Sequence, residues 1–182
     1  MQKYDIFSLC RLFFGRKEKF GMKKFFTVKN LCLSGIIAAL YAGLTILLQA
    51  ISFGPVQVRI SEAMTLLPLL TPAAIPGLAI GCFIANLMCS TWQDWVFGTL
   101  ATLLAAVLTR RFRSNIHLAA AMPVLCNAFI IGPMLYFLFG GSWLLNILSV
   151  GLGEAVSCFA LGIPLIRALK QMPGLFERGI RK

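Results

Sequence analysis

Residues 71–76, Thr-Pro-Ala-Ala-Ile-Pro, interrupt an apolar run that extends from residue 63 to residue 87. The residue before a proline is biased away from the helical conformation, so this stretch predicts a turn between two helices. One unbroken helix over residues 63–87 is the alternative. The choice decides the fold, because one helix gives the chain five membrane spans and two helices give it six.

The composition is that of an integral membrane protein. Of the 182 residues, 59% are hydrophobic and 13% are charged, whereas soluble domains carry about 25% charged residues. At roughly 20 residues per span, the length allows about six spans and no second soluble domain. The net charge of +11 does not predict a nucleic-acid partner, because the basic residues flank apolar segments, where they set membrane topology.

Sixteen of the 17 basic residues fall in three blocks. They are Lys3, Arg11, Arg16, Lys17, Lys19, Lys23, Lys24 and Lys29; Arg110, Arg111 and Arg113; and Arg167, Lys170, Arg178, Arg181 and Lys182. Basic loops stay on the cytoplasmic side of a bilayer, so an even number of spans separates each pair of blocks. This favours two helices over residues 63–87 and predicts an all-α membrane protein with six transmembrane helices and both termini in the cytoplasm.

The predicted organisation is a basic cytoplasmic segment (residues 1–27), a six-helix transmembrane domain (residues 28–170) and a basic cytoplasmic tail (residues 171–182). The first span is predicted over residues 28–50, and Gly54-Pro55 then opens an extended polar segment. A second helix over residues 60–71 would be about 18 Å long, shorter than the roughly 30 Å hydrocarbon core. We therefore expect it to be incomplete or buried among its neighbours.

The third helix is expected to end near residue 89, and the remaining three are predicted over residues 95–108, 117–139 and 143–168. Residues 90–95 form a predicted outer loop, and residues 140–142 a predicted turn. All three tryptophans, Trp92, Trp95 and Trp143, then fall at outer helix ends. Tryptophan is enriched at membrane interfaces, so their placement independently favours six spans.

The residues give no indication of catalysis, a cofactor or a metal. The six cysteines are scattered without a C-x-x-C pair and read as small buried hydrophobes. His117 is the single histidine, and a zinc site would need clustered Cys or His ligands. A phosphate-binding G-x-x-x-x-G-K-[ST] loop is absent from the sequence, so the chain itself is not predicted to hydrolyse ATP.

Glu154 is the most informative polar residue. It lies near the middle of the last predicted span, where an acidic side chain costs about 2.5–3.5 kcal/mol. A residue that costly predicts a functional site, and the alternatives are a structural hydrogen bond to another helix or simple protonation. Asn146 is placed on the same helix face, and Asn127 and Asn86 lie in other apolar spans.

Three further charged residues are candidates. Arg59 and Glu62 could contact a ligand or pair with each other on one helix face. Asp94 is expected in a wet outer loop, where it could cover the mouth of a cavity and attract a cation. Small residues recur along the first span at 34–35, 38–39 and 42–43, which favours either docking to another membrane protein or close packing within this one.

Several separated stretches together resemble one family. They are residues 53–63 (FGPVQVRISEA), 71–78 (TPAAIPGL), 81–87 (GCFIANL), Asp94 with 97–103 (FGTLATL), 123–128 (PVLCNA) and 150–154 (VGLGE). In this order, over about residues 31–170, they resemble the QueT family of queuosine-precursor transporters.

The resemblance implies a substrate-binding S component of an energy-coupling factor transporter. Such a subunit is a multi-pass protein of the cell membrane with a six-helix fold and a ligand pocket near the outer face. Its partners would be a transmembrane coupling protein and two cytoplasmic ATPases. The family's A-x-x-x-A motif, which contacts the coupling protein, matches Ala38 and Ala42.

The implied ligand is a 7-deazaguanine, whose guanine-like edge suits a carboxylate acceptor. Glu154 is the first candidate for that edge, Asn127 and Asn86 could bond the remaining ring atoms, and one of three aromatic side chains could stack on the base. A cationic aminomethyl substituent could sit near Glu62 or Asp94, and the sequence leaves open whether the nitrile, the aminomethyl compound or free queuine binds. The candidate substrate-binding residues are Glu154, Asn127, Asn86, Arg59, Glu62, Asp94, Phe53, Trp95, Trp143 and Asn146.

A stand-alone proton-coupled carrier, with Glu154 as the protonated group, is the alternative function.

Overall fold

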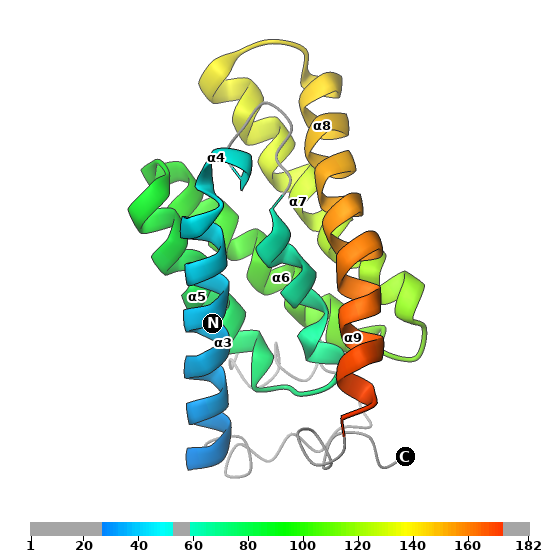
Figure 1. Cartoon of the computed structure of the whole chain (residues 1–182). Coiled ribbons are helices and arrows are strands. Elements are labelled where there is room, and N and C mark those ends of the chain that lie inside the picture. Colours follow the sequence, from blue (N-terminus) through cyan, green and yellow to red (C-terminus); the bar gives the residue numbers. More distant parts are fainter. Residues whose placement is uncertain (1–26, 53–58, 173–182) are drawn as a thin grey trace, which may run out of the picture.

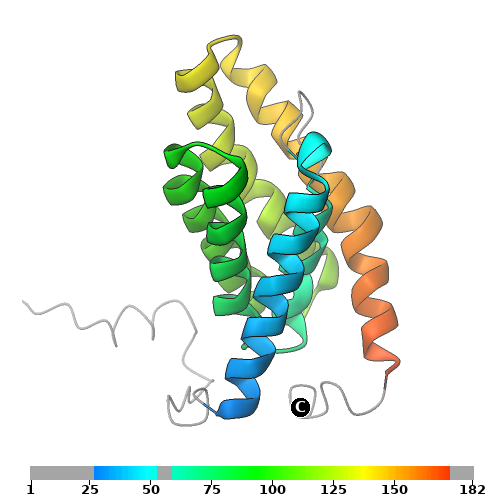
Figure 2. The ribbon, with the colours of Figure 1, turned by 60° about the vertical axis from the view of Figure 1, so that its left-hand side comes forward.

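The computed structural model describes residues 27–52 and 59–172, and the regular elements within these ranges are all helical (Figures 1 and 2). In chain order they are α3 (Val28–Leu47), α4 (Gln49–Ser52), η1 (Ile60–Leu69), α5 (Ala74–Cys89), η2 (Asp94–Gly98), α6 (Thr99–Arg111), α7 (Ile116–Phe139), α8 (Trp143–Ala155), η3 (Val156–Gly162) and α9 (Ile163–Lys170). The η1 segment is a 3₁₀ helix, whereas η2 and η3 are π-helical.

The predicted break between two helices is confirmed. The η1 helix ends at Leu69 and α5 begins at Ala74, so the proline-containing stretch separates them. The Thr71 hydroxyl accepts a hydrogen bond from the Ala73 N–H, which satisfies one backbone donor where the helical pattern is broken. A single helix over residues 63–87 is therefore wrong.

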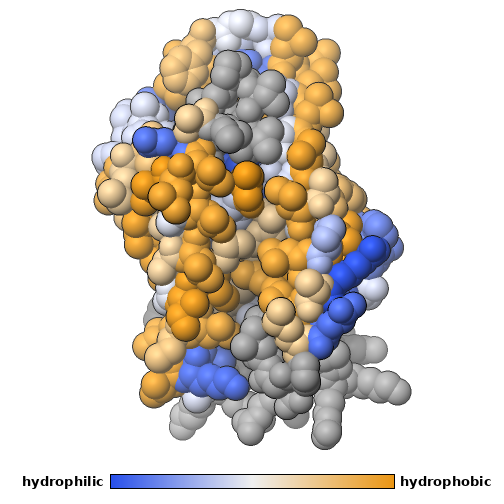
Figure 3. Space-filling view, in the orientation of Figure 1, coloured by the Kyte–Doolittle hydropathy of each residue, from blue (hydrophilic) through white to orange (hydrophobic). Residues whose placement is uncertain are grey.

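Three helices of the described residues are long and apolar enough to cross a membrane. They are Val28–Leu47, Ile116–Phe139 and the continuous run Trp143–Lys170. The chain is accordingly a multi-pass membrane protein, and its six-span topology stays a prediction. Several leucines on α3 and α8, among them Leu31, Leu47 and Leu145, are more than half exposed. Figure 3 shows a largely hydrophobic outer surface over α3, as expected of a face that contacts lipid.

The short η1 helix lies at the centre of the helix bundle. Its residues from Ser61 to Leu69 are all buried, and in Figure 1 it runs between α3 and the η3–α9 part of the last long helix. Leu66 and Leu70 pack with Ile37, Tyr41 and Leu78 in the main hydrophobic core. The expectation of a short second helix buried among its neighbours is confirmed.

Arg110 differs from the sequence-based expectation. It was placed in a basic turn at the cytoplasmic surface, but the structure buries it to 8% exposure, with Nη1 donating to the Pro68 carbonyl at 2.9 Å. The carbonyls at a helix end lack partners within the helix, and Arg110 supplies one to η1. Burying this guanidinium fixes the end of η1 against α6.

The described basic residues outside the site lie at one end of the bundle. Lys29 begins α3, while Arg167 and Lys170 end α9, and Figure 1 shows the start of α3 and the end of α9 at the same end. Trp143 begins α8 at the opposite end. This arrangement is the one that cytoplasmic placement of both termini requires, although the side of the membrane stays a prediction.

Candidate functional site

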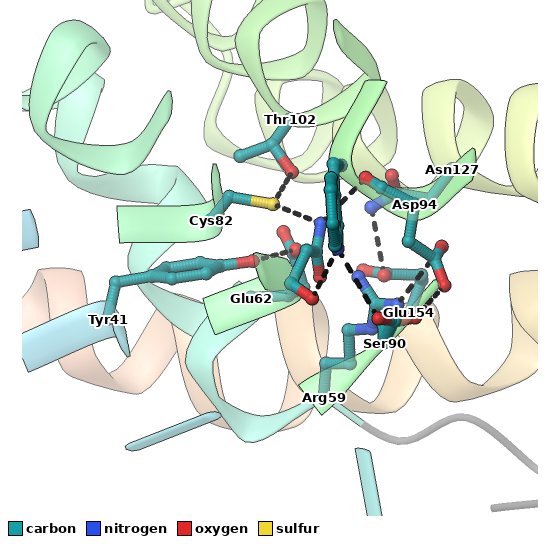
Figure 4. Close-up of polar contacts among 11 residues, drawn as sticks. Tyr41, Arg59, Glu62, Cys82, Ser90, Asp94, Thr102, Asn127 and Glu154 are labelled. Atoms are coloured by element: carbon teal, nitrogen blue, oxygen red, sulfur yellow. Dashed lines mark hydrogen bonds and ion pairs between the residues drawn. The ribbon is translucent and has the colours of Figure 1, made fainter. Parts of the chain in front are cut away.

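Six buried polar residues from five parts of the chain lie in the interior of the bundle, and Figure 4 shows the side chains of most of them converging. They are Arg59 before η1, Glu62 in η1, Asn86 in α5, Asp94 in η2, Asn127 in α7 and Glu154 in α8. We call these six residues the polar cluster. Each of the six is less than a tenth exposed. The cluster includes Glu62, Asp94 and Glu154, which are all the acidic residues within the described ranges.

Glu62 is fully buried and receives its hydrogen bond from α3. The Tyr41 hydroxyl donates to Glu62 Oε1, and Figure 4 shows the two side chains pointing toward each other. The second carboxylate oxygen, Oε2, has no hydrogen-bond partner within the described residues. An ionised carboxylate accepts at both oxygens, so Glu62 keeps unused acceptor capacity.

Glu154 is held by an amide on the neighbouring helix. Asn127 Nδ2 donates to Glu154 Oε1 at 2.8 Å. Cys158 Sγ lies 4.0 Å from Glu154 Oε2 and 3.7 Å from the Glu62 carbonyl oxygen, so this thiol lies between the two acidic residues. Glu154 is also within electrostatic reach of Glu62 and Arg59.

Asp94 is anchored through several groups. Arg59 forms an ion pair with it at 3.9 Å, the Ser90 hydroxyl donates to its Oδ2, and Asn86 Nδ2 donates to its backbone carbonyl at 2.9 Å. Trp95 Nε1 donates to the Asn86 carbonyl at 2.9 Å. These bonds tie the end of α5 to η2.

Two sequence-based expectations about these charges are corrected by the structure. Asp94 was expected in a wet loop, but it begins a π-helical segment and is 8% exposed. Glu62 was a possible ion-pair partner of Arg59, but the ion pair of Arg59 is with Asp94, and Glu62 accepts a hydrogen bond from Tyr41. Arg59 and Glu62 are still within electrostatic reach of each other. Spacing along the chain allowed a local pair, and the approach of η2 and α3 supplies the ion pair and the hydrogen bond instead.

Both π-helical segments adjoin acidic residues of the site. The η2 segment begins at Asp94, and η3 begins two residues after Glu154 and contains Cys158. A π-bulge inserts a residue into the helical repeat and is frequent at functional sites. Gly98, in η2, leaves room for the amide beside it, because a Cβ there would come within 2.7 Å of Asn86 Nδ2.

The other predicted ligand residues lie apart from the polar cluster or are only adjacent to it. Asn146 Nδ2 donates to the Gly140 carbonyl in the turn before α8, and Trp143 is 52% exposed. Trp95 adjoins the cluster through its bond to Asn86. Phe53 lies outside the described residues.

Four further residues that the sequence did not indicate as site residues contact the site: Tyr41, Ser90, Cys82 and Thr102. Thr102 Oγ1 donates to Cys82 Sγ at 3.3 Å, and Asn86 Nδ2 donates to the same sulfur at 3.4 Å. The cysteine was expected to act as a buried hydrophobe; it is buried, and it also accepts polar hydrogen bonds. A tyrosine in the middle of an apolar span was the one signal that could have indicated Tyr41, because a buried phenol usually needs a partner. Within the described residues no group of His, Cys, Asp and Glu is arranged to hold a metal ion.

The small residues of α3 divide into two rows. Ala38 and Ala42 are each 6% exposed and belong to the face that meets α5, where a Cβ on Gly81 would come within 2.7 Å of the Ala38 carbonyl oxygen. Gly35 and Ala39 are exposed on the outer face of the same helix. Close packing within the protein, one of the two alternatives for these small residues, thus accounts for Ala38 and Ala42. Their contact with a coupling protein stays a prediction.

Comparison with known proteins bears on the identity of this bundle. Residues 31–171 match the family model described as QueT transporter. The queuosine precursor transporter QueT of Lactococcus lactis subsp. cremoris (strain MG1363) is 40% identical over 86 residues, which is 44% of this chain and 51% of that protein. The matched region therefore spans about half the length of this relative, and no solved structure matches the chain. Since the family match covers most of the chain, including the polar cluster, the protein belongs to the QueT transporter family.

Proposed function

We propose that this protein is the substrate-binding S component of an ATP-driven energy-coupling factor importer for a queuosine precursor of the 7-deazaguanine type. The observation that carries the proposal is the polar cluster, which gathers every acidic residue of the described chain in the interior of an apolar bundle. Buried ionisable groups in a membrane are costly and mark ligand or ion sites. A flat, polar base gives these groups hydrogen-bonding partners.

Glu154 is the proposed acceptor for the guanine-like edge of the base. A carboxylate has about four lone-pair sites, and the bond from Asn127 to Oε1 occupies one of them. Two adjacent N–H groups of the base can therefore still donate to this carboxylate. Asn127 acts as a positioning residue, because its amide fixes the rotamer of Glu154 before the ligand arrives.

Trp95 is the proposed stacking partner for the base. Its indole is partly buried and its N–H is already bonded to the Asn86 carbonyl, so the ring is held in place beside the polar cluster. Trp92 and Trp143 are 61% and 52% exposed, which suits the membrane interface better than a binding site. Phe53 remains a candidate from sequence alone.

Binding by the purified full-length protein tests this assignment. We expect 7-cyano-7-deazaguanine to bind the wild type in a calorimetric titration in detergent, and Glu154→Gln to lower its affinity about ten- to hundredfold, because a charge-assisted bond is lost. Asn127→Ala should weaken binding less, and Asn30→Ala, which removes an amide at the far end of α3, should not change it. Unchanged affinity in a folded Glu154→Gln protein would refute the assignment.

Coupling to ATPases is proposed on the family resemblance, with α3 as the docking helix. Gly35 and Ala39 are the small residues that α3 exposes on its outer face, where a partner helix could approach closely. We therefore expect Ala39→Leu to block co-purification of the coupling protein without altering ligand affinity. Ala160→Leu places the same bulk at an exposed position of η3 and should leave co-purification intact. Loss of partner in both variants, or in neither, would contradict docking through α3.

The alternative of a proton-coupled carrier is separated by uptake in cells that lack the ATPases. An S component should accumulate no labelled precursor in that background, whereas a stand-alone carrier should continue to do so. Loss of uptake on collapse of the proton gradient, with the ATPases still active, would favour the carrier.

A further inference from the structure

We infer that this site selects a base that carries a cationic amine over a neutral analogue, and that Glu62, not Asp94, receives the amine. The inference rests on the proposed function, since it concerns the substituent of the base that Glu154 is proposed to hold. It decides between two carboxylates that the sequence alone left equivalent.

The charge of the polar cluster favours a cationic ligand. It contains three carboxylates, Glu62, Asp94 and Glu154, and one guanidinium, that of Arg59, so with all groups ionised one positive and three negative charges leave a formal charge of −2. The other described basic residues lie toward the end of the bundle where α3 begins and α9 ends. Arg110, among them, donates to the Pro68 carbonyl. Residues 53–58 include no charged side chain. A cationic ligand reduces this excess, and a neutral ligand does not.

The three carboxylates differ in the partners that they already have. Asp94 faces Arg59 and accepts from Ser90, and Glu154 accepts from Asn127. Glu62 is 0% exposed and accepts from the phenol of Tyr41, a neutral donor, while Thr102 and the charge of Arg59 also interact with it. Asp94 has the ion pair with Arg59, and Glu154 is proposed to hold the base. A buried carboxylate without an ion pair is unfavourable, so Glu62 gains most from an ammonium group.

The buried side chains of the site also leave hydrogen-bond acceptors unused. Several buried side-chain oxygens in η1, α5 and around η2 accept no hydrogen bond within the described residues: Glu62 Oε2, Asn86 Oδ1, Gln93 Oε1, Thr99 Oγ1 and Asp94 Oδ1, which faces Arg59 in the ion pair. These oxygens can accept hydrogen bonds, and an ammonium group has three N–H donors and no acceptor atom. A nitrile is an acceptor alone and would leave these oxygens unsatisfied.

Glu62 and Glu154 flank the same thiol and lie within electrostatic reach of each other. Cys158 Sγ is 3.7 Å from the Glu62 carbonyl oxygen and 4.0 Å from Glu154 Oε2, and the two carboxylates come from different elements, η1 and α8. One carboxylate can therefore take the guanine-like edge while the other takes the substituent. Base recognition and amine selection become separable by mutation.

A pair of matched ligands tests the inference on the wild-type full-length protein. The probes are 7-aminomethyl-7-deazaguanine and 7-hydroxymethyl-7-deazaguanine, which are nearly equal in size and differ in charge. We expect the amine to bind about ten- to hundredfold more tightly, the range for a hydrogen bond to a charged group. Glu62→Gln should remove this preference by weakening the amine alone, Asp94→Asn should retain it, and Lys170→Gln should leave both affinities unchanged.

Each outcome is decisive. Equal affinity of the two probes for the wild type would overturn the inference while leaving the proposed function intact. Binding of neither probe would refute the proposed function and the inference with it. Loss of the preference in Asp94→Asn but not in Glu62→Gln would reassign the amine to Asp94. Should Glu62→Gln fail to fold, Glu62→Asp, which keeps the charge and shortens its reach, is expected to reduce the amine's advantage, and an unaltered preference in it would contradict the role of Glu62.

Discussion

The Tyr41 hydroxyl donates a hydrogen bond to Glu62 Oε1, so its removal takes a donor away from a fully buried carboxylate. We expect Tyr41→Phe to lower the free energy of unfolding by about 1–3 kcal/mol, the cost of an unsatisfied buried polar group. Thermal unfolding of the ligand-free protein in detergent measures this. Added amine-bearing ligand should restore part of the loss, because it donates to the same carboxylate.

Tyr136→Phe is the matched control for this change. Tyr136 is 39% exposed and packs its ring edge-on against Phe137, a contact that phenylalanine can retain. We expect its unfolding temperature to stay at the wild-type value. An equal loss in both variants would mean that the bond to Glu62 contributes nothing specific.

The contact between α3 and α5 depends on glycines that let the two backbones approach. A Cβ at Gly81 would lie 2.7 Å from the Ala38 carbonyl oxygen and 3.0 Å from Tyr41 Cβ, and a backbone atom cannot move aside without shifting the helix. We expect Gly81→Ala to destabilise the protein by about 1–3 kcal/mol, as overpacking of a core does. Because Tyr41 is displaced with it, ligand binding should weaken as well.

Gly35→Ala controls for the loss of a glycine from a helix. Nothing lies within 4 Å of a Cβ built at Gly35, and alanine is the better helix former by about 1 kcal/mol. The variant should unfold at the wild-type temperature or slightly above it. A loss as large as that of Gly81→Ala would show that helix packing is not the cause.

The orientation of the whole bundle in the membrane follows from its charge and can be measured. Cysteines introduced at Ser142, in the turn before α8, and at Lys170, at the end of α9, lie at opposite ends of the bundle in Figure 1. In intact cells we expect a membrane-impermeant maleimide to label Ser142→Cys above the wild-type background, and Lys170→Cys only after permeabilisation. Labelling of Lys170→Cys in intact cells would reverse the predicted topology.

Many features of the helices could be predicted because they depend on local physics. The α3 helix begins at Val28 and α5 ends at Cys89, where apolar periodicity and helix-breaking residues place these boundaries. Trp143 and the basic ends of α6 and α9 follow from interfacial preference and the positive-inside bias. The buried, costly Glu154 was recognisable from its position in an apolar span.

Partner choice within the site could not be predicted, because it depends on which helices meet. Arg59 and Glu62 are three residues apart, yet the ion pair of Arg59 is with Asp94 in η2 and the hydrogen bond of Glu62 is from Tyr41 in α3. The same holds for α3, where helix geometry alone could not say which of two adjacent rows of small residues would face α5.

By itself the sequence determined a helical membrane protein with a helix break after Leu69, basic ends and an acidic residue within the last long helix, since each of these follows from local apolarity, proline and charge. Only the tertiary structure decided that Glu62, Asp94 and Glu154 share one buried cluster with a single guanidinium. The physical reason is that the energy of a buried charge is set by its nearest partners, and those partners are brought together by packing between helices that are distant in the chain.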